Sequence, residues 1–201
     1  MSTEVIVAFI SGVLGPIILL YTKNKLEKKK EIPDMVKETL LVSELITTKI
    51  EHIKEEFKAD RVWITQFHNG GHFYPTGKSM AKFSVIYETV SQNTNSIQSN
   101  FQNIPVNLFS KSINYLLEND VIEIHDYKDE SVATHGLKYI AEDTGCKSGY
   151  LFARKTIDNK FIGTLGLDFS KRKTKLDVDS INHLQVHATS VGGVLMGHLN
   201  G

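Results

Sequence analysis

The chain opens with a run of hydrophobic positions, residues 5–21, that no charged residue interrupts between Glu4 and Lys23. A helix of this length, at about 1.5 Å per residue, spans roughly 25 Å, the lower limit for the hydrocarbon core of a bilayer. No basic side chain precedes the run, and five lysines follow it: Lys23, Lys25, Lys28, Lys29 and Lys30. Since basic residues stay on the cytoplasmic side, this pattern predicts a single-pass membrane protein with its N-terminus outside and its C-terminal domain in the cytoplasm.

Two other interpretations of residues 5–21 fit less well. A cleaved signal peptide carries its positive charges before the apolar stretch, whereas here they follow it. A buried core helix is the remaining alternative, since short apolar runs often pack inside a domain. A helix at the edge of a domain needs a polar face, however, and residues 5–21 have none. We therefore expect these residues to attach the chain to a membrane.

Residues 32–58 change to an amphipathic helical pattern, with Pro33 near the start of the helix. Apolar or small residues recur there every seven positions in two parallel rows: Ile32, Thr39, Ile46 and Ile53, and Val36, Ser43, Ile50 and Phe57. A seven-residue repeat is typical of helices that pair, so this heptad stripe predicts a homodimer. The alternative is that the same stripe packs against the helix's own domain.

The rest of the chain predicts an α+β unit. Alternating β-branched and aromatic residues indicate strands at 61–68, 79–90, 121–125, 146–156 and 160–170. Asn69-Gly70-Gly71 is expected to end the first strand, and the polar segment 91–103 to form a long loop. Helical periodicity indicates helices at 105–119 and 130–144, and a last helix that Asp177 caps. The order of elements favours a mostly antiparallel sheet between two long helices.

Composition narrows the classes of function. The chain has 23 basic and 23 acidic residues, so no overall field attracts nucleic acid, which is not an expected partner. The single cysteine, Cys146, excludes an intramolecular disulfide and suits a reducing compartment. About 170 residues remain after the predicted anchor, enough for one well-buried domain.

The last predicted hairpin resembles that of a known family. Residues 161–168 (Phe-Ile-Gly-Thr-Leu-Gly-Leu-Asp) and 149–154 (Gly-Tyr-Leu-Phe-Ala-Arg) are similar to the closing strands of GAF domains, and the length and element order agree. The resemblance covers residues 37–201. It implies a central antiparallel sheet with long N- and C-terminal helices on one face and a ligand-sized pocket on the other. The chain then divides into an anchor with a basic segment (1–31), a linker or dimer helix (32–58) and a GAF-like domain (59–201).

The family's sharper signatures are absent. The chain has no Asn-Lys-Phe-Asp-Glu run, which is associated with members that bind cyclic nucleotides. Bilin-binding members attach their chromophore through a cysteine usually followed by histidine, whereas Lys147 follows Cys146. Members that reduce methionine sulfoxide need several cysteines. The resemblance therefore implies no particular cofactor, and without a recognisable set of nucleophile, base and orienting group we expect no enzyme.

Polar, aromatic and glycine residues gather in one segment, residues 66–78. The side chains expected to bind a ligand there are Gln66, His68, Asn69, His72, Tyr74 and Lys78. Glycines let a backbone approach a ligand closely, and these side chains offer donors and acceptors. In the resembling fold this segment lies near the mouth of the pocket, and Arg154 on the later hairpin is a candidate partner for an anion. The alternative is a structured turn and a surface arginine.

The histidines give little indication of a metal. His183 and His187 share one face of the last predicted helix, as zinc ligands do. The glutamate that follows the first histidine in the metalloprotease motif is missing, and the spacing suggests no third ligand. We therefore expect surface or packing histidines and no metal.

Together these patterns predict a membrane-anchored cytoplasmic GAF-like domain that binds a small ligand or a protein partner as a homodimer. The alternative is a structural scaffold at a membrane, of a kind that a phage encodes, whose pocket is filled by its own side chains.

Overall fold

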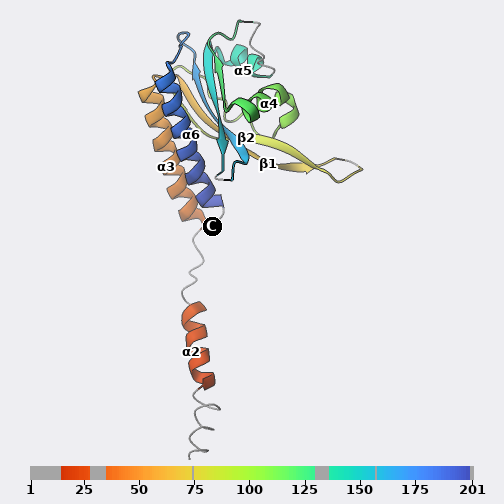
Figure 1. Ribbon diagram of the computed structural model, residues 1–201, viewed down its shortest axis with the longest axis vertical. Helices are drawn as coiled ribbons and strands as arrows, with labels where there is room; N and C mark the ends of the chain where they lie inside the picture. The colour runs from red at the N-terminus through yellow and green to blue at the C-terminus, as the bar shows by residue number, and fades with distance from the viewer. Residues whose placement is uncertain (1–14, 28–34, 74, 130–135, 157, 200–201) are drawn as a thin grey trace, which may run out of the picture. The chain divides into compact units, whose positions relative to one another are not determined.

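The computed structural model describes residues 15–27, 35–73, 75–129, 136–156 and 158–199 (Figure 1). The chain divides into two compact units, Met1–Glu38 and Thr39–Gly201. In the first unit, α2 (Gly15–Glu27) exposes a row of apolar side chains, Ile17, Ile18, Leu19, Leu20 and Tyr21. The second unit holds the whole sheet, the rest of α3 from Thr39 onward, and the helices that follow it.

None of the helices in the described residues is long and apolar enough to span a bilayer. Residues 5–14 of the predicted anchor lie outside the described residues, and residues 15–21 belong to α2. The 13 residues of α2 reach only about 20 Å, short of the roughly 30 Å of a hydrocarbon core. Its second half also contains Lys23 and Lys25. The predicted single-pass topology, with an outer N-terminus and a cytoplasmic domain, is therefore wrong.

Six strands form one antiparallel sheet in the order β3-β2-β1-β6-β5-β4. They are β1 (Arg61–His72), β2 (Ser79–Val90), β3 (Ile104–Pro105), β4 (Val121–Ile124), β5 (Ser148–Lys155) and β6 (Phe161–Phe169). β1 pairs with β6 only from Arg61 to Ile64, whereas its pairing with β2 continues to His72. The outer part of the β1–β2 hairpin therefore projects from the domain (Figure 1). The prediction of an antiparallel α+β fold is confirmed.

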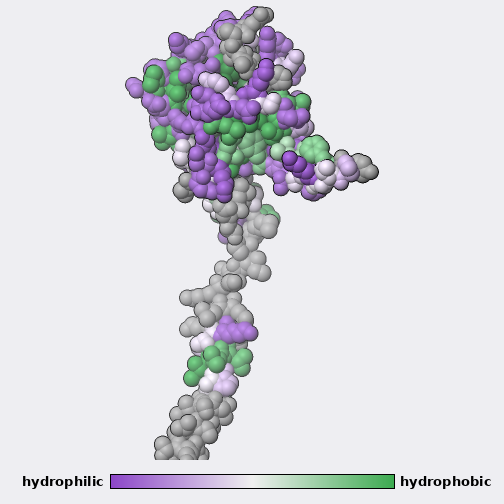
Figure 2. Space-filling view, turned by 45° about the vertical axis from the view of Figure 1, so that its right-hand side comes forward, coloured by the Kyte–Doolittle hydropathy of each residue, from purple (hydrophilic) through white to green (hydrophobic). Residues whose placement is uncertain are grey.

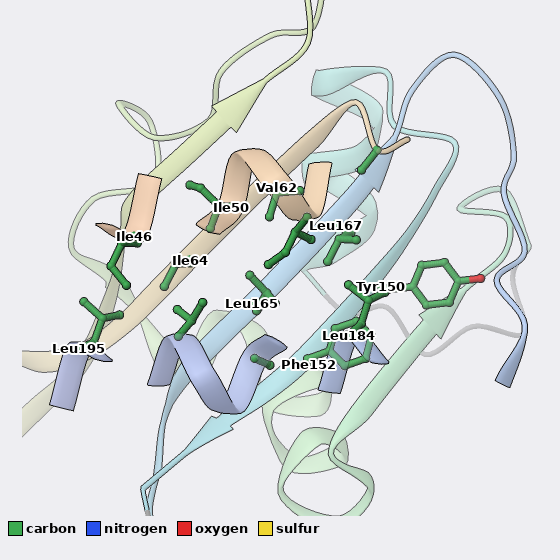
Figure 3. Close-up of a cluster of buried hydrophobic side chains, with 14 of the residues drawn as sticks. Ile46, Ile50, Val62, Ile64, Tyr150, Phe152, Leu165, Leu167, Leu184 and Leu195 are labelled. Atoms are coloured by element: carbon green, nitrogen blue, oxygen red, sulfur yellow. The ribbon is translucent and has the colours of Figure 1, made fainter. Parts of the chain in front are cut away.

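The two long helices, α3 (Met35–Glu56) and α6 (Val178–Leu199), lie side by side on one face of this sheet (Figure 1). Their apolar stripes pack on alternate residues of the central strands, as Figure 3 shows for Ile50 and Leu195. The buried residues of this core include Ile46, Ile50, Ile53, Leu184, Ala188, Val191, Leu195, Val62, Ile64, Phe152, Leu165 and Leu167. Asp177 caps α6 as expected, since its Oδ1 accepts a hydrogen bond from the Ser180 amide at 2.8 Å.

The C-terminal part of the heptad stripe of α3 packs on its own domain, whereas its N-terminal part, Val36 and Thr39, is exposed. Ile46, Ile50 and Ile53 are each 0% exposed and belong to the core of their own domain. Ser43 lies near the sheet as well, since its hydroxyl is 3.1 Å from the Tyr87 hydroxyl. These residues therefore follow the alternative interpretation of the repeat, and Ile46, Ile50 and Ile53 are not available to a partner, so the homodimer stays a prediction. Ile32 lies outside the described residues.

The opposite face of the sheet is covered by shorter elements, η2 (Val106–Phe109), α4 (Ser110–Asn119) and α5 (Leu137–Thr144) (Figure 1). Segment 91–103 contains no helix or strand, as expected, but it places Ile97 in the core with only 2% of its surface exposed. Its backbone is held by Glu88, whose carboxylate accepts hydrogen bonds from the amides of Ile97 and Gln98 at 2.9 and 3.0 Å. A second hydrophobic core forms between these elements and the sheet.

Some element boundaries differ from those expected. Asn69-Gly70-Gly71 does not end β1, because pairing with β2 carries the strand on to His72. The helix expected at 105–119 begins only at Ser110, since Pro105 pairs with Lys82 at the sheet edge and a 3-10 turn follows. Of the helix expected at 130–144, residues 130–135 lie outside the described residues. α5 ends at Gly145, whose φ of +68° suits glycine.

Candidate ligand cavity

An apolar cavity of about 40 Å³ lies between the sheet and the shorter helices. From the strands it is lined by Trp63, Thr65, Phe67, Phe83, Val85, Leu151 and Thr164. From the covering elements it is lined by Ile97, Phe101, Phe109, Ser112, Ile113, Leu116, Leu137 and Ile140. The sheet face that forms its floor follows from strand alternation, because every second residue of a strand points to the same side.

The polar groups of the lining are hydroxyls. The Thr65 and Thr164 hydroxyls are 2.7 Å apart, and the Thr164 amide donates to Thr65 Oγ1 at 2.9 Å. Trp63 turns its indole N–H away from the cavity lining, toward the Asp168 carboxylate at 3.0 Å. None of the described lining residues carries a charge. The cavity therefore suits an uncharged group, since an unpaired ion would lose its hydration without compensation.

A second, open depression of about 480 Å³ lies on the outside of the same face. Three side chains line both spaces: Phe101, Phe109 and Ile140. Phe109 packs edge-on against Phe83, with ring centroids 5.2 Å apart, and forms part of the partition between the two. Gly136 leaves room for this ring, because a Cβ at Gly136 would lie 2.7 Å from Phe109 Cδ1. Phe109, together with Phe101 and Ile140, therefore separates the inner cavity from the outer depression.

Exposed hydrophobic residues surround the outer depression. Leu108 is 52% and Tyr139 is 77% exposed, and both line it. The space-filling view shows hydrophobic surface gathered on the domain near the base of the projecting hairpin (Figure 2). The outer depression is thus mainly apolar, with Asp143 as the charged residue of its lining.

The site residues predicted from the sequence do not line this cavity. Gln66 and His68 alternate with Thr65 and Phe67, and only the latter two are lining residues. His68 instead has its Nε2 2.9 Å from the Ser84 hydroxyl. Asn69, His72 and Lys78 are exposed on the projecting part of the hairpin. Tyr74 lies outside the described residues.

Arg154 is a buried structural residue rather than a surface arginine. Its side chain is 0% exposed, and it donates to the Thr65 carbonyl at 2.8 Å and to Gln66 Oε1 at 2.9 Å. It reaches β1 across β6 where Gly163 lies, since a Cβ there would be only 2.1 Å from the Thr65 oxygen. Burial lowers the pKa of Arg154 to about 10. Arg154 and Gln66, two of the predicted site residues, are therefore hydrogen-bonded to each other, but the bond connects β5 to β1 and does not form part of the cavity lining.

A buried charge network lies beside the cavity. Asp168 accepts hydrogen bonds from Arg61 Nε at 2.8 Å and from Trp63 Nε1 at 3.0 Å. Arg61 also donates to the Asn95 carbonyl at 2.8 Å, which ties segment 91–103 to the sheet. Burial alone would lower the pKa of Arg61, but the Asp168 carboxylate outweighs it and raises the pKa. The network fixes Trp63, and with it one wall of the cavity.

Cys146 is buried and unreactive in this setting. It is 8% exposed, and its sulfur lies 3.1 Å from the Ser148 carbonyl oxygen. Burial, and next the negative charge of Asp168, raises the pKa of the Cys146 thiol far above its ordinary value. The thiol form is therefore favoured, and the side chain acts as a small hydrophobic residue of the core.

The sheet, the terminal helices on one face and the cavity on the other define a GAF-like fold. A far-red cyanobacteriochrome photoreceptor superimposes with a TM-score of 0.62 at 14% identity, over 90% of this chain and 98% of that one. The phycocyanobilin-bound GAF domain of a cyanobacterial phytochrome superimposes with a TM-score of 0.60 at 17% identity, over 92% of this chain and 96% of that one. The Thermosynechococcus elongatus PixJ GAF-domain in its blue-light absorbing form has a TM-score of 0.61 at 14% identity, over 79% of this chain and 86% of that one.

Sequence comparison adds no relative. No protein-family model matches the chain, and no curated protein matches it. At identities of 14–17% the solved structures show the fold alone. The GAF-like fold expected from the closing hairpin is thereby confirmed, while function must be argued from the residues of this chain.

Proposed function

We propose that this chain is a ligand-binding domain that takes a small, neutral and mainly apolar molecule between the sheet and the η2–α4–α5 cover. The observation that carries the proposal is the cavity lined by aromatic and aliphatic side chains with only hydroxyls as polar groups. Ligand sites are typically such apolar hollows with a few placed polar groups. The GAF-like fold supports the proposal, because solved neighbours hold phycocyanobilin or phycoerythrobilin in domains of this fold.

The size of the cavity restricts the ligand and its mode of entry. A volume of about 40 Å³ is only a few times the roughly 10–15 Å³ that a cavity needs to hold one water molecule. A larger ligand therefore has to displace Phe109 and use the outer depression as well. A ring or short chain with one hydroxyl matches the inner cavity, with the outer depression added once Phe109 is displaced, and the Thr65, Thr164 and Ser112 side chains.

A covalently bound bilin is not the ligand we propose. The only cysteine, Cys146, is buried and its thiol is held in the protonated form. Lys147 follows it, not the histidine usual beside an attachment cysteine. The lining also lacks a described cation that would pair with a propionate. We propose binding without catalysis, since no nucleophile–base pair occurs among the described lining residues.

Fluorescence of Trp63 tests the proposal directly, because Trp63 is the only tryptophan and lines the cavity. Benzyl alcohol titrated into the full chain is expected to change Trp63 emission in a saturable way. Benzoate, the same ring with a charged group, is expected to cause no saturable change, because the lining offers it no counter-charge.

Two variants of α4 distinguish the cavity from other sites. Leu116 lines the cavity and is 1% exposed, whereas Leu117 is 50% exposed and is not a lining residue. Leu116→Phe should fill the cavity and abolish the saturable change, and Leu117→Phe should leave it intact. Equal responses from both variants, or saturable binding of benzoate alone, would contradict the proposal.

A further inference from the structure

Two histidines of α6 meet a glutamate of α3 on the helical side of the domain. Glu56 is the last residue of α3, and His183 and His187 lie one turn apart on α6. Glu56 Oε1 is 3.0 Å from His183 Nδ1, and Glu56 Oε2 is 3.4 Å from His187 Nε2. The three ligand atoms lie within 4.8 Å of one another. The cluster is separate from the ligand cavity, since it lies on the other face of the sheet.

The spacing of these atoms matches that of ligands around a small metal ion. With Zn–N and Zn–O bonds of about 2.0–2.1 Å, two ligands of a tetrahedral zinc ion are about 3.3 Å apart. The two carboxylate–imidazole distances of 3.0 and 3.4 Å bracket this value. The three ligand atoms lie within 4.8 Å of one another, so they would close by at most about 1.5 Å to reach the spacing of tetrahedral ligands.

One nitrogen of the cluster is shielded from solvent and has no hydrogen-bond partner among the described residues. His187 Nε2 is shielded from solvent and, among the described residues, makes no hydrogen bond of good geometry, although it faces Glu56. A metal ion would give this nitrogen the partner that a buried polar atom requires.

The residues around the cluster leave it open to solvent on one side and pack against the histidine rings on another. His52, one turn before Glu56 on α3, has its Nε2 3.7 Å from Glu56 Oε2, and its side chain is 69% exposed. The ring of Phe57 packs edge-on against both α6 histidines, at 6.0 and 6.3 Å between ring centroids. Phe57 thus positions the imidazoles, while His52 stands where a fourth ligand or a water molecule would complete the coordination.

We infer that Glu56, His183 and His187 bind a divalent transition-metal ion, Zn²⁺ in the first place. Two imidazoles and one carboxylate are a ligand set that zinc uses when one position is left for water or a further side chain. The ion would join the end of α3 to α6, and so link the two helices that cover one face of the sheet. Since metal binding requires the folded arrangement of two distant segments, it would stabilise the fold.

Thermal unfolding of the full chain, after removal of metals with EDTA and dialysis, tests the inference. At a ZnCl₂ concentration 100 times the dissociation constant, we expect the melting temperature to rise by about 5–10 °C for a domain of this size. Mass spectrometry of metals after a second dialysis should find one zinc per chain. Co²⁺ in place of zinc should give the intense visible absorption of a tetrahedral site.

Single variants locate the ion. Glu56→Gln, His183→Gln and His187→Gln remove one ligand each from partly exposed positions, so their metal-free melting temperatures should stay near that of the parent chain. Each should lose the zinc-dependent shift and the bound zinc. His125→Gln is the matched control, since His125 is 43% exposed and also lies near a glutamate, Glu123, at 3.3 Å.

Three results would overturn the inference. The first is an unchanged melting temperature of the parent chain in excess zinc, with no zinc retained after dialysis. The second is full zinc binding by the Glu56, His183 and His187 variants, which would place the ion elsewhere. The third is an equal loss in the His125→Gln control, which would indicate adventitious surface binding only.

Discussion

A single carboxylate, that of Asp168, holds two donors of the neighbouring strand inside the domain. Arg61 is 1% exposed and reaches it through two nitrogens, at 2.8 and 2.5 Å, while Trp63 adds its indole N–H. Glu88, 3.9 Å from Arg61, contributes further negative charge. Buried ions of this kind are tolerated only when paired and hydrogen-bonded. The pair therefore determines whether β1 and β6 remain together at this point.

Replacing Asp168 by alanine should be strongly destabilising. Arg61 would keep its charge in the interior with only the more distant Glu88 to compensate, so we expect a loss of about 3–5 kcal/mol in the free energy of unfolding. Chemical denaturation monitored by circular dichroism measures this loss. Asp158→Ala is the control, because Asp158 is exposed at the surface with Lys160 and the Thr156 hydroxyl as its partners, and little change is expected there. Similar stability of the two variants would contradict the role assigned to Asp168.

Asp60 makes the stability of the domain depend on pH in the acid range. Burial opposes its ionisation, but hydrogen bonds from the amides of Lys171 and Ser170, together with the Lys171 ammonium, outweigh burial and lower its pKa. A carboxylate whose pKa is lower in the folded state stabilises the fold above its unfolded pKa of about 4. This stabilisation is then lost as the pH falls through the lower, folded value.

The expected outcome is a decrease in unfolding free energy below about pH 4 that is shallower in Asp60→Asn than in the parent chain. The variant keeps an acceptor oxygen for the Ser170 and Lys171 amides, so it should still fold at neutral pH. Asp143→Asn, at an exposed position of α5, serves as the control and should retain the parent's pH dependence. An Asp60→Asn curve parallel to the parent curve in that range would show that Asp60 does not contribute.

Among the elements, α3 shows how one stripe of residues supports two different structures. A seven-residue repeat suits both a coiled-coil seam and a helix packed on its own sheet. The structure uses Ile46, Ile50 and Ile53 for the second purpose. Other apolar side chains of the same helix stay outside, including Leu40, Leu41 and Leu45 at 64%, 59% and 46% exposed. The repeat alone does not distinguish the two cases, because it contains no information on the partner surface.

A glutamate introduced on the buried side of α3 should destabilise the domain, whereas one on the exposed side should not. Ile50→Glu would bury an unpaired carboxylate in the core and should abolish cooperative thermal unfolding. Leu41→Glu, on the exposed side, should leave far-UV circular dichroism and the unfolding transition close to those of the parent chain. If Ile50→Glu folds as well as Leu41→Glu and only changes the molecular mass in light scattering, Ile50 lies at an interface between copies instead.

The elements also show where local sequence signals suffice. The alternation in β5 and β6 and the Asp177 cap of α6 act over a few residues, and all three are found as expected. The end of β1 is different, because Asn69-Gly70-Gly71 is a local stop signal that the neighbouring strand overrides. Pairing of His72 with Ser79 of β2 extends the strand. Interactions between distant segments therefore set this boundary.

At the scale of the whole molecule, the two faces of the sheet have different contents. One face carries α3 and α6 with a packed core, and the other carries the cavity under η2, α4 and α5. The resemblance to GAF domains predicts this division from the sequence. The polar pattern of residues 66–78, however, predicts the ligand site in that segment, most of which does not line the cavity. Cavity residues such as Leu116 and Leu137 have the same patterns as any core residue, so no local signal distinguishes them. The Glu56–His183–His187 cluster also has no local sequence signal, because the fold brings together residues from α3 and from α6, which are far apart in the sequence.

Methyl NMR of isoleucine side chains reports directly on ligand binding in the cavity, because isoleucines lie on both faces of the sheet. Ile97, Ile113 and Ile140 line the cavity, whereas Ile46, Ile50 and Ile53 of α3 pack on the opposite face. Addition of benzyl alcohol to the full chain should shift the first group of methyl signals in a saturable manner and leave the second group in place. Equal shifts of both groups, or no shift of the cavity group at saturating benzyl alcohol, would contradict ligand binding in this cavity.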